Sequence, residues 1–259
     1  MNIDTWIKIW RTGFAVAILG VAQFIVCSII AMVLYPGGTI ETRQTSNYRL
    51  SQNYLGDLGR EVSLNNKDNE TGSRIFNGSM ILLGLCSIPF FLFLPTHAAD
   101  RVGWLSIAAI FGVVSALLLI TIASSPVDIS PFAHYVALFF WVVTTFFCTS
   151  IHAGCMLTSK ENPSLGLALV SVAVAMLTVS YIYHSTETAA AVMFGREIPL
   201  KSVFLQKLVF ISWMIWVMVF SARSLLVTDF SEYAEHRIKK DTDDYLKELE
   251  NQPWTGQRK

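Results

Sequence analysis

The sequence predicts an all-α protein, a six-helix transmembrane bundle with a long extracytoplasmic loop between helices 1 and 2. Two observations predict this class. Hydrophobic residues make up 53% of the 259 residues and charged residues only 15%, whereas a soluble domain carries about 25% charged residues. The apolar residues are also gathered in continuous runs, and each of six runs reaches the roughly 20 residues with which a helix crosses a bilayer core of about 30 Å.

The first run follows Lys8 and Arg11. It is longer than the hydrophobic part of a signal peptide, about 7–15 residues, and no small-residue cleavage site closes it, so a retained helix is expected. Proline or glycine marks the joints after the first three runs, at residues 36–38, Pro95 and Pro126. The expected spans are residues 12–35, 75–94, 102–124, 132–157, 165–184 and 203–227.

Residues 1–229 therefore form one six-span membrane domain, with an outer loop over residues 36–74. An even number of spans places both termini on one side of the membrane, and a modest excess of Lys and Arg favours the cytoplasm for that side. The prediction is a multi-pass protein of the cell membrane with both termini cytoplasmic. Residues 230–259 form a charged cytoplasmic tail of mixed sign, which is typical of a solvated surface helix or a tether.

Several classes of protein are disfavoured. Lys plus Arg and Asp plus Glu both total 19, so no basic field indicates nucleic acid. The cysteines lie in apolar runs without metal-ligand spacing and are expected to pack as small apolar residues. No cofactor is predicted. No H-E-x-x-H motif occurs, so the sequence indicates no particular metal site, and whether a metal is bound is left open. Mid-span segments hold no acidic or basic residue, which makes a transporter the third and least favoured class.

Polar residues gather at the extracytoplasmic ends of the spans. A carboxylate near a histidine at a partly desolvated interface is a usual arrangement for general acid/base chemistry. The candidate catalytic residues are Asp57, Asp128 and His134, and the candidate substrate-binding residues are Asn77, Arg60, Arg74 and His184. His97 and His152 are expected near the opposite membrane surface, at a similar level.

We expect Asp57, Asn77, Asp128 and His134 to converge on one pocket or polar network. A carboxylate or amide at the edge of lipid needs hydrogen-bond donors, and the nearest are one another, the loop arginines and the backbone around Gly56 and Gly59. An alternative stays open in which Asp57 has a structural role: the loop folds back as a lid, and Asp57 pairs with a loop arginine.

Three segments carry a family resemblance: YPGGT at 35–39, NYLGDLG at 53–59 and SPVD at 125–128, together with Asn69, Phe76-Asn77 and His134. They resemble the "domain of unknown function 998" family of prokaryotic multi-span membrane proteins, over roughly residues 10–225. The resemblance implies about six membrane helices and no established activity. The family often has serine where Gly56 stands, so a serine-dependent role at that position is in doubt.

The function predicted from the sequence is the binding or processing of a lipid or amphiphile at the outer leaflet, with membrane lipids as partners. The alternative is a non-enzymatic scaffold or partner subunit that binds another protein through residues 230–259 or the outer loop. Whether the protein is an enzyme is left open.

Overall fold

The computed structural model describes the backbone of residues 3–160, 163–193 and 201–226, and the side chains of residues 5–160, 163–185 and 201–226. Within these ranges the protein is helical, with no β-strand, so the all-α prediction is confirmed. Three short 3-10 helices span Leu55–Gly59, Leu94–His97 and Ala99–Arg101. The α-helices are α1 (Ile3–Leu34), α2 (Glu70–Leu92), α3 (Val102–Ser124), α4 (Pro131–Thr158), α5 (Leu165–Met193) and α6 (Lys201–Leu226).

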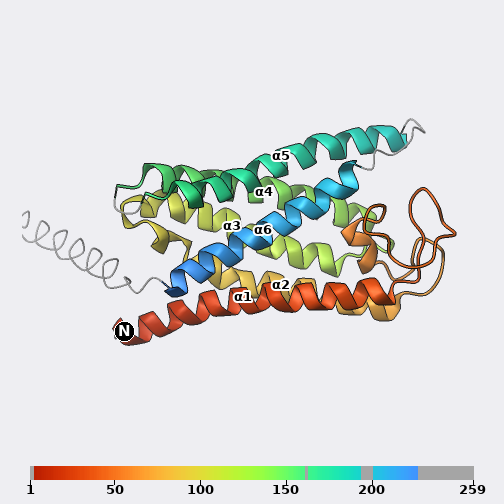
Figure 1. The fold of residues 1–259 in the computed structure, drawn as a ribbon, viewed down its shortest axis with the longest axis horizontal. Helices are drawn as coiled ribbons and strands as arrows, with labels where there is room; N and C mark the ends of the chain where they lie inside the picture. The colour runs from red at the N-terminus through yellow and green to blue at the C-terminus, as the bar shows by residue number, and fades with distance from the viewer. Residues whose placement is uncertain (1–2, 161–162, 194–200, 227–259) are drawn as a thin grey trace, which may run out of the picture.

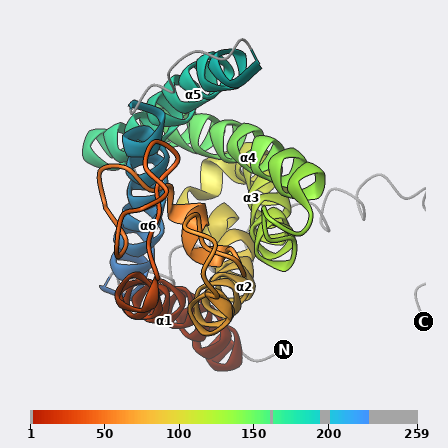
Figure 2. The same cartoon turned by 90° about the vertical axis from the view of Figure 1, so that its right-hand side faces the viewer.

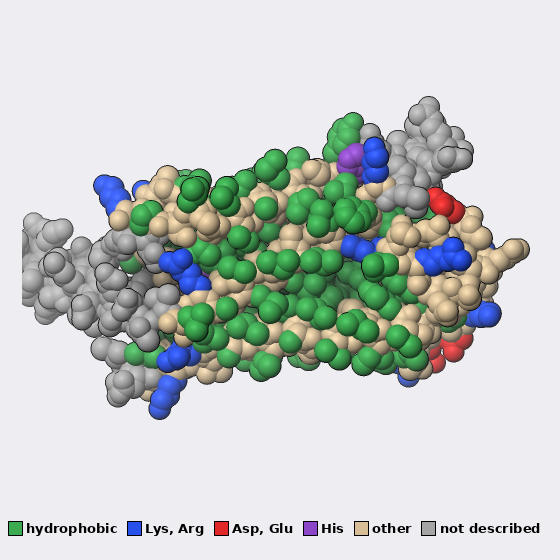
Figure 3. Space-filling model, viewed as in Figure 1, with side chains coloured by type: hydrophobic (Ala, Val, Ile, Leu, Met, Phe, Trp, Pro, Cys, Tyr) green, Lys and Arg blue, Asp and Glu red, His purple; other side chains and the backbone are tan. Residues whose placement is uncertain are grey.

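In the described part of the chain, six helices are long and apolar enough to cross a membrane, as expected of a multi-pass integral membrane protein. Hydrophobic side chains cover the middle of the molecule, whereas Lys, Arg, Asp and Glu gather toward its two ends (Figure 3). Helix α2 begins at Glu70, five residues before the span expected from residue 75. Its first turn is polar, with an ion pair between Glu70 and Arg74, so a hydropathy criterion does not register it.

The helices form a closed bundle in which each packs against the next along the chain and α6 returns to α1 (Figures 1 and 2). Helix α1 begins and α6 ends at the same end of the bundle. Residues 35–69 lie at the other end, here called the loop end, and Figure 2 looks onto it. The predicted tail, residues 230–259, lies outside the described ranges.

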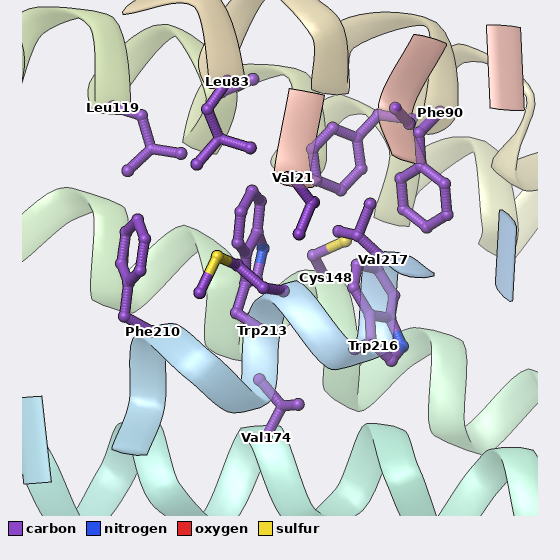
Figure 4. Close-up of a cluster of buried hydrophobic side chains, with 14 of the residues drawn as sticks. Val21, Leu83, Phe90, Leu119, Cys148, Val174, Phe210, Trp213, Trp216 and Val217 are labelled. Atoms are coloured by element: carbon purple, nitrogen blue, oxygen red, sulfur yellow. The ribbon is translucent and has the colours of Figure 1, made fainter. Parts of the chain in front are cut away.

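The middle of the bundle is filled by aromatic and aliphatic side chains (Figure 4). Trp213 and Trp216 of α6 are 1% and 0% exposed and lie among residues such as Phe90 of α2 and Cys148 of α4. Helices α2 and α3 approach closely at Gly112, where a Cβ would lie 2.0 Å from the ring of Phe91. Small residues at helix crossings are typical of membrane bundles, because association there depends on close packing.

The loop between α1 and α2 folds over the loop end and is fixed to it by hydrogen bonds. Tyr54 Oη lies 2.5 Å from Ser202 Oγ, and the Leu55 amide donates to Gln206 Oε1 at 2.8 Å. These contacts join the start of the 3-10 helix Leu55–Gly59 to the first turns of α6. The position of this helix above the bundle therefore follows from contacts with α6, about 150 residues away in the chain.

Candidate functional site

A small pocket lies at the loop end, beneath the 3-10 helix Leu55–Gly59 and among α2, α3, α4, α5 and α6. Its volume is about 40 Å³. Most of its wall is apolar, from residues such as Phe76, Leu119 and Val209, and no Asp, Glu, Lys or Arg among the described residues lines it. The lining residues that offer polar groups are Gly56, Gly59, Asn77, His134, Trp141, Tyr181 and Gln206.

Asn77 enters the pocket from the second turn of α2 and is held by the loop. Its Nδ2 donates to the Gly59 carbonyl at 2.9 Å and to Ser73 Oγ at 3.1 Å. A Cβ at position 59 would lie 2.4 Å from Asn77 Oδ1. A side chain at position 59 would therefore displace the Asn77 amide from its present position.

His134 lies in the first turn of α4 and is 8% exposed. Its Nδ1 lies 2.9 Å from the Ser125 carbonyl oxygen. A carbonyl can only accept, so Nδ1 carries the hydrogen, and in the neutral ring Nε2 is left as an acceptor. A Cβ built at Gly56 would lie 3.7 Å from Nε2, so this nitrogen lies beside the Gly56 backbone.

Trp141 lies two turns further along α4 and is 3% exposed. Its Nε1–H is buried and has no hydrogen-bond partner among the described residues. The neighbouring polar groups are already engaged, since Gln206 accepts from Leu55 and also bonds the Tyr181 hydroxyl. A buried donor without a partner costs about 1–3 kcal/mol, so Trp141 is the exceptional group of this pocket.

Asp57 does not line the pocket. Its Oδ2 accepts from the Tyr54 amide at 2.9 Å and from Asn53 Nδ2 at 3.1 Å, and the residue is 5% exposed. Burial raises the pKa of this carboxyl, while the Asn53 hydrogen bond and the charge of Arg60 oppose the rise. Its contacts support the loop, and the catalytic role stays a prediction.

Asp128 also lies outside the lining, although Pro126 and Val127 belong to it. Its Oδ2 accepts from the Val62 amide at 2.9 Å, and its Oδ1 is buried without a partner within the described part of the chain. Asp128 therefore fixes the far side of the loop to the segment between α3 and α4.

The other predicted substrate-binding residues lie elsewhere at the loop end. Arg60 Nε donates to the Val62 carbonyl at 3.3 Å, and Arg74 pairs with Glu70 on the exposed surface of α2. His184 lies near the end of α5 with its ring 5.1 Å from that of Tyr183. Of the predicted site residues, the pocket brings together Asn77 and His134. The alternative pairing of Asp57 with a loop arginine does not form as an ion pair among the described side chains.

Lys207 is a residue of the loop end that was not predicted from the sequence. It lies near the start of α6, is 8% exposed and donates from Nζ to the Asn53 carbonyl, 5.9 Å from the centre of the Tyr48 ring. A lysine inside an apolar run is the signal that could have indicated it, because charge within a span is costly unless it has partners.

A second polar cluster lies at the opposite end of the bundle. His97 Nδ1 lies 3.1 Å from His152 Nε2, and His152 Nδ1 lies 3.0 Å from Ser171 Oγ, which also accepts from Trp216 Nε1 at 2.8 Å. The ring of His97 stacks on that of Phe220 with centres 5.3 Å apart. The two histidines thus meet at one level, as the sequence predicts. Their hydrogen bonds are accounted for by side chains within the bundle.

No group of three or more His, Cys, Asp or Glu residues that could hold a metal ion occurs in the described part of the chain. Comparison with family models, curated proteins and solved structures gives no match to this chain. The family resemblance of the three loop segments therefore stays a prediction, and the pocket alone carries the functional conclusion.

Proposed function

We propose that this integral membrane protein binds a membrane amphiphile at its loop end, and that this end faces the outside of the cell membrane. The observation that carries the proposal is that Trp141, which lines a pocket with mostly apolar walls, has a buried Nε1–H with no partner within the described ranges. A donor kept without a partner in such a place lowers stability, and an acceptor atom on a ligand would remove that cost.

The depth of the pocket suits an amphiphile. Asn77 and His134 lie within two turns of the loop-end termini of α2 and α4, where a membrane helix leaves the hydrocarbon core. Apolar residues such as Met80, Leu138 and Phe210 line the same pocket. A polar head group could therefore contact Asn77 and His134 while an alkyl chain contacts the apolar wall.

Binding accounts for this lining better than covalent catalysis. No carboxylate, thiol or aliphatic hydroxyl of the described residues lines the pocket, so within this part of the chain neither a carboxylate pair nor the usual nucleophiles lie next to a bound molecule. Of the described side chains there, His134 could act as a general base. Transport is disfavoured because the packed side chains of Figure 4 fill the bundle centre.

The proposal can be tested with an alkyl chain that carries a photoreactive diazirine, added to the full-length protein in phosphatidylcholine nanodiscs. We expect crosslinks on the peptides of α4 and α6 that hold Trp141 and Phe210. Gly56→Leu would place a side chain against His134 Nε2 and should remove these crosslinks. Gly78→Leu is the matched control, because a Cβ at Gly78 meets nothing within 4 Å.

Labelling spread evenly over the lipid-facing helix surfaces, and unchanged by Gly56→Leu, would contradict the proposal. Circular dichroism and gel filtration of both variants check that the bundle is intact.

A further inference from the structure

The pocket offers no charge to a head group. Among the described residues, no Asp, Glu, Lys or Arg lines it, and two cations of the loop end are engaged with loop carbonyls: Lys207 donates to Asn53, and Arg60 to Val62. A phosphate, carboxylate or ammonium group placed there would lose its hydration without gaining a counter-charge. The head group that suits the pocket is therefore uncharged.

The pocket offers hydrogen-bonding groups of both kinds. Trp141 Nε1–H is a donor without a partner in the described part of the chain, and Nε2 of the neutral His134 ring is an acceptor close to Gly56. Of the common neutral lipid head groups, a hydroxyl both accepts and donates, so it can accept from Trp141 Nε1–H and donate to His134 Nε2. An ester or ketone could only accept and would leave His134 Nε2 without a donor.

The volume of the pocket limits the size of the group that it can hold. About 40 Å³ is room for a few water-sized groups, at roughly 10–15 Å³ each, and is far below the roughly 150 Å³ of a cavity that holds benzene. A sugar or a ring does not fit, whereas a hydroxymethyl group does.

We infer that the pocket is specific for the small, uncharged hydroxyl head group of a lipid alcohol, held between Trp141 Nε1–H and His134 Nε2. The inference rests on the proposed amphiphile binding and adds its chemical class. A long-chain alcohol and a diacylglycerol both present such a hydroxyl.

The test compares ligands that share one chain and differ in the head group. Full-length protein in phosphatidylcholine nanodiscs is titrated with hexadecanol, hexadecyl phosphate, palmitate, hexadecane and a diacylglycerol, each competing with the photoreactive chain. We expect at least one of the two hydroxyl lipids to compete roughly ten- to hundredfold better than the charged ligands and hexadecane, because each of the two hydrogen bonds contributes roughly a three- to tenfold gain in affinity. If hexadecanol competes better, the hydroxyl comes from a long-chain alcohol. If the diacylglycerol competes better, it comes from a diacylglycerol.

Two variants test the contacts. Trp141→Phe removes the donor and keeps a ring, and Gly56→Ser puts a hydroxyl of the protein beside His134 Nε2, so that it competes with the hydroxyl of the ligand. Each should weaken hydroxyl-lipid binding roughly three- to tenfold and leave hexadecane unchanged. The matched controls are Trp104→Phe, at a tryptophan that is 60% exposed, and Gly78→Ser.

The outcomes separate the two proposals. Equal competition by all ligands, or preference for a charged one, overturns the hydroxyl inference while amphiphile binding stands. The hydroxyl inference is also overturned if both variants fold and bind hydroxyl lipids as the wild type does. No competition by any ligand, together with no crosslinking in the pocket, overturns both proposals.

Discussion

Asp57 is a buried carboxylate with hydrogen-bond donors and no ion pair in the described structure. Burial favours its protonated form. The hydrogen bonds from Asn53 and Tyr54 and the positive charges of Arg60 and Lys207 favour the ionised form, but they offset burial only in part, so the pKa is raised. The native state therefore binds the proton more tightly than the unfolded chain, whose aspartates titrate near pH 3.9. As the pH rises above about 4, this carboxyl makes a growing unfavourable contribution to stability.

Asp57→Asn should reveal this contribution. Asparagine keeps an oxygen that can accept from Tyr54 and Asn53 but carries no charge, so the free energy of unfolding of the variant should rise relative to wild type between about pH 4.5 and about pH 7.5. Urea unfolding in detergent micelles, followed by tryptophan fluorescence at both pH values, measures the difference. A difference that stays constant or moves the other way would mean that the ionised carboxylate is stabilised by the loop.

His152 is 0% exposed, and its two ring nitrogens join His97 to Ser171. His152→Leu removes both hydrogen bonds and leaves His97 Nδ1 without its partner, whereas Ser171 Oγ keeps Trp216 Nε1, so it should lower the unfolding free energy by about 2–4 kcal/mol. Thr121→Val is the control, because Thr121 is exposed and bonds only its own helix, to the Leu117 carbonyl. A thermal-shift assay in detergent compares the two. If His152→Leu proved as mild as Thr121→Val, the cluster would not support the bundle.

At the scale of helices, the crossing of α2 and α3 depends on the absence of a side chain at Gly112. The ring of Phe91 occupies the position that a Cβ would take, at 2.0 Å. Gly112→Ala should therefore destabilise the protein by about 1–3 kcal/mol through overpacking. Gly154→Ala in α4 meets nothing within 4 Å and should be neutral or slightly stabilising. Equal unfolding midpoints for the two variants would show that α2 and α3 can separate without cost.

The helices were predictable from the sequence because crossing a membrane imposes a length and a composition on each one. The third span, residues 102–124, coincides with α3, since Pro126 and the charge of Arg101 mark its ends. The start of α2 was not predictable by the same rule, because its first turn is polar and is stabilised by the Glu70–Arg74 pair.

The site was predictable only in part, for a physical reason. Depth along a helix follows from the sequence, and this placed Asn77 and His134 at one level. The direction of the Asp57 carboxylate is decided by Asn53 and Tyr54 within the loop. The Nε1–H of Trp141 has no partner among the described residues, and the sequence does not show which groups surround it. Such contacts join distant parts of the chain, and no periodicity in the sequence reports them.

At the scale of the whole molecule, the orientation in the membrane remains a prediction, and the outer-leaflet proposal depends on it. Lys67 and Lys8 are exposed residues at opposite ends of the bundle, in the loop and in α1. Lys67→Cys should react with a membrane-impermeant maleimide in intact cells, and Lys8→Cys only after permeabilisation, because basic residues favour the cytoplasm for the termini. Wild type is the control, since its four cysteines lie in the spans and should react little. The reverse pattern would place the loop end inside the cell. The pocket and its hydroxyl specificity would then belong to the inner leaflet, while the six-helix bundle would be unaffected.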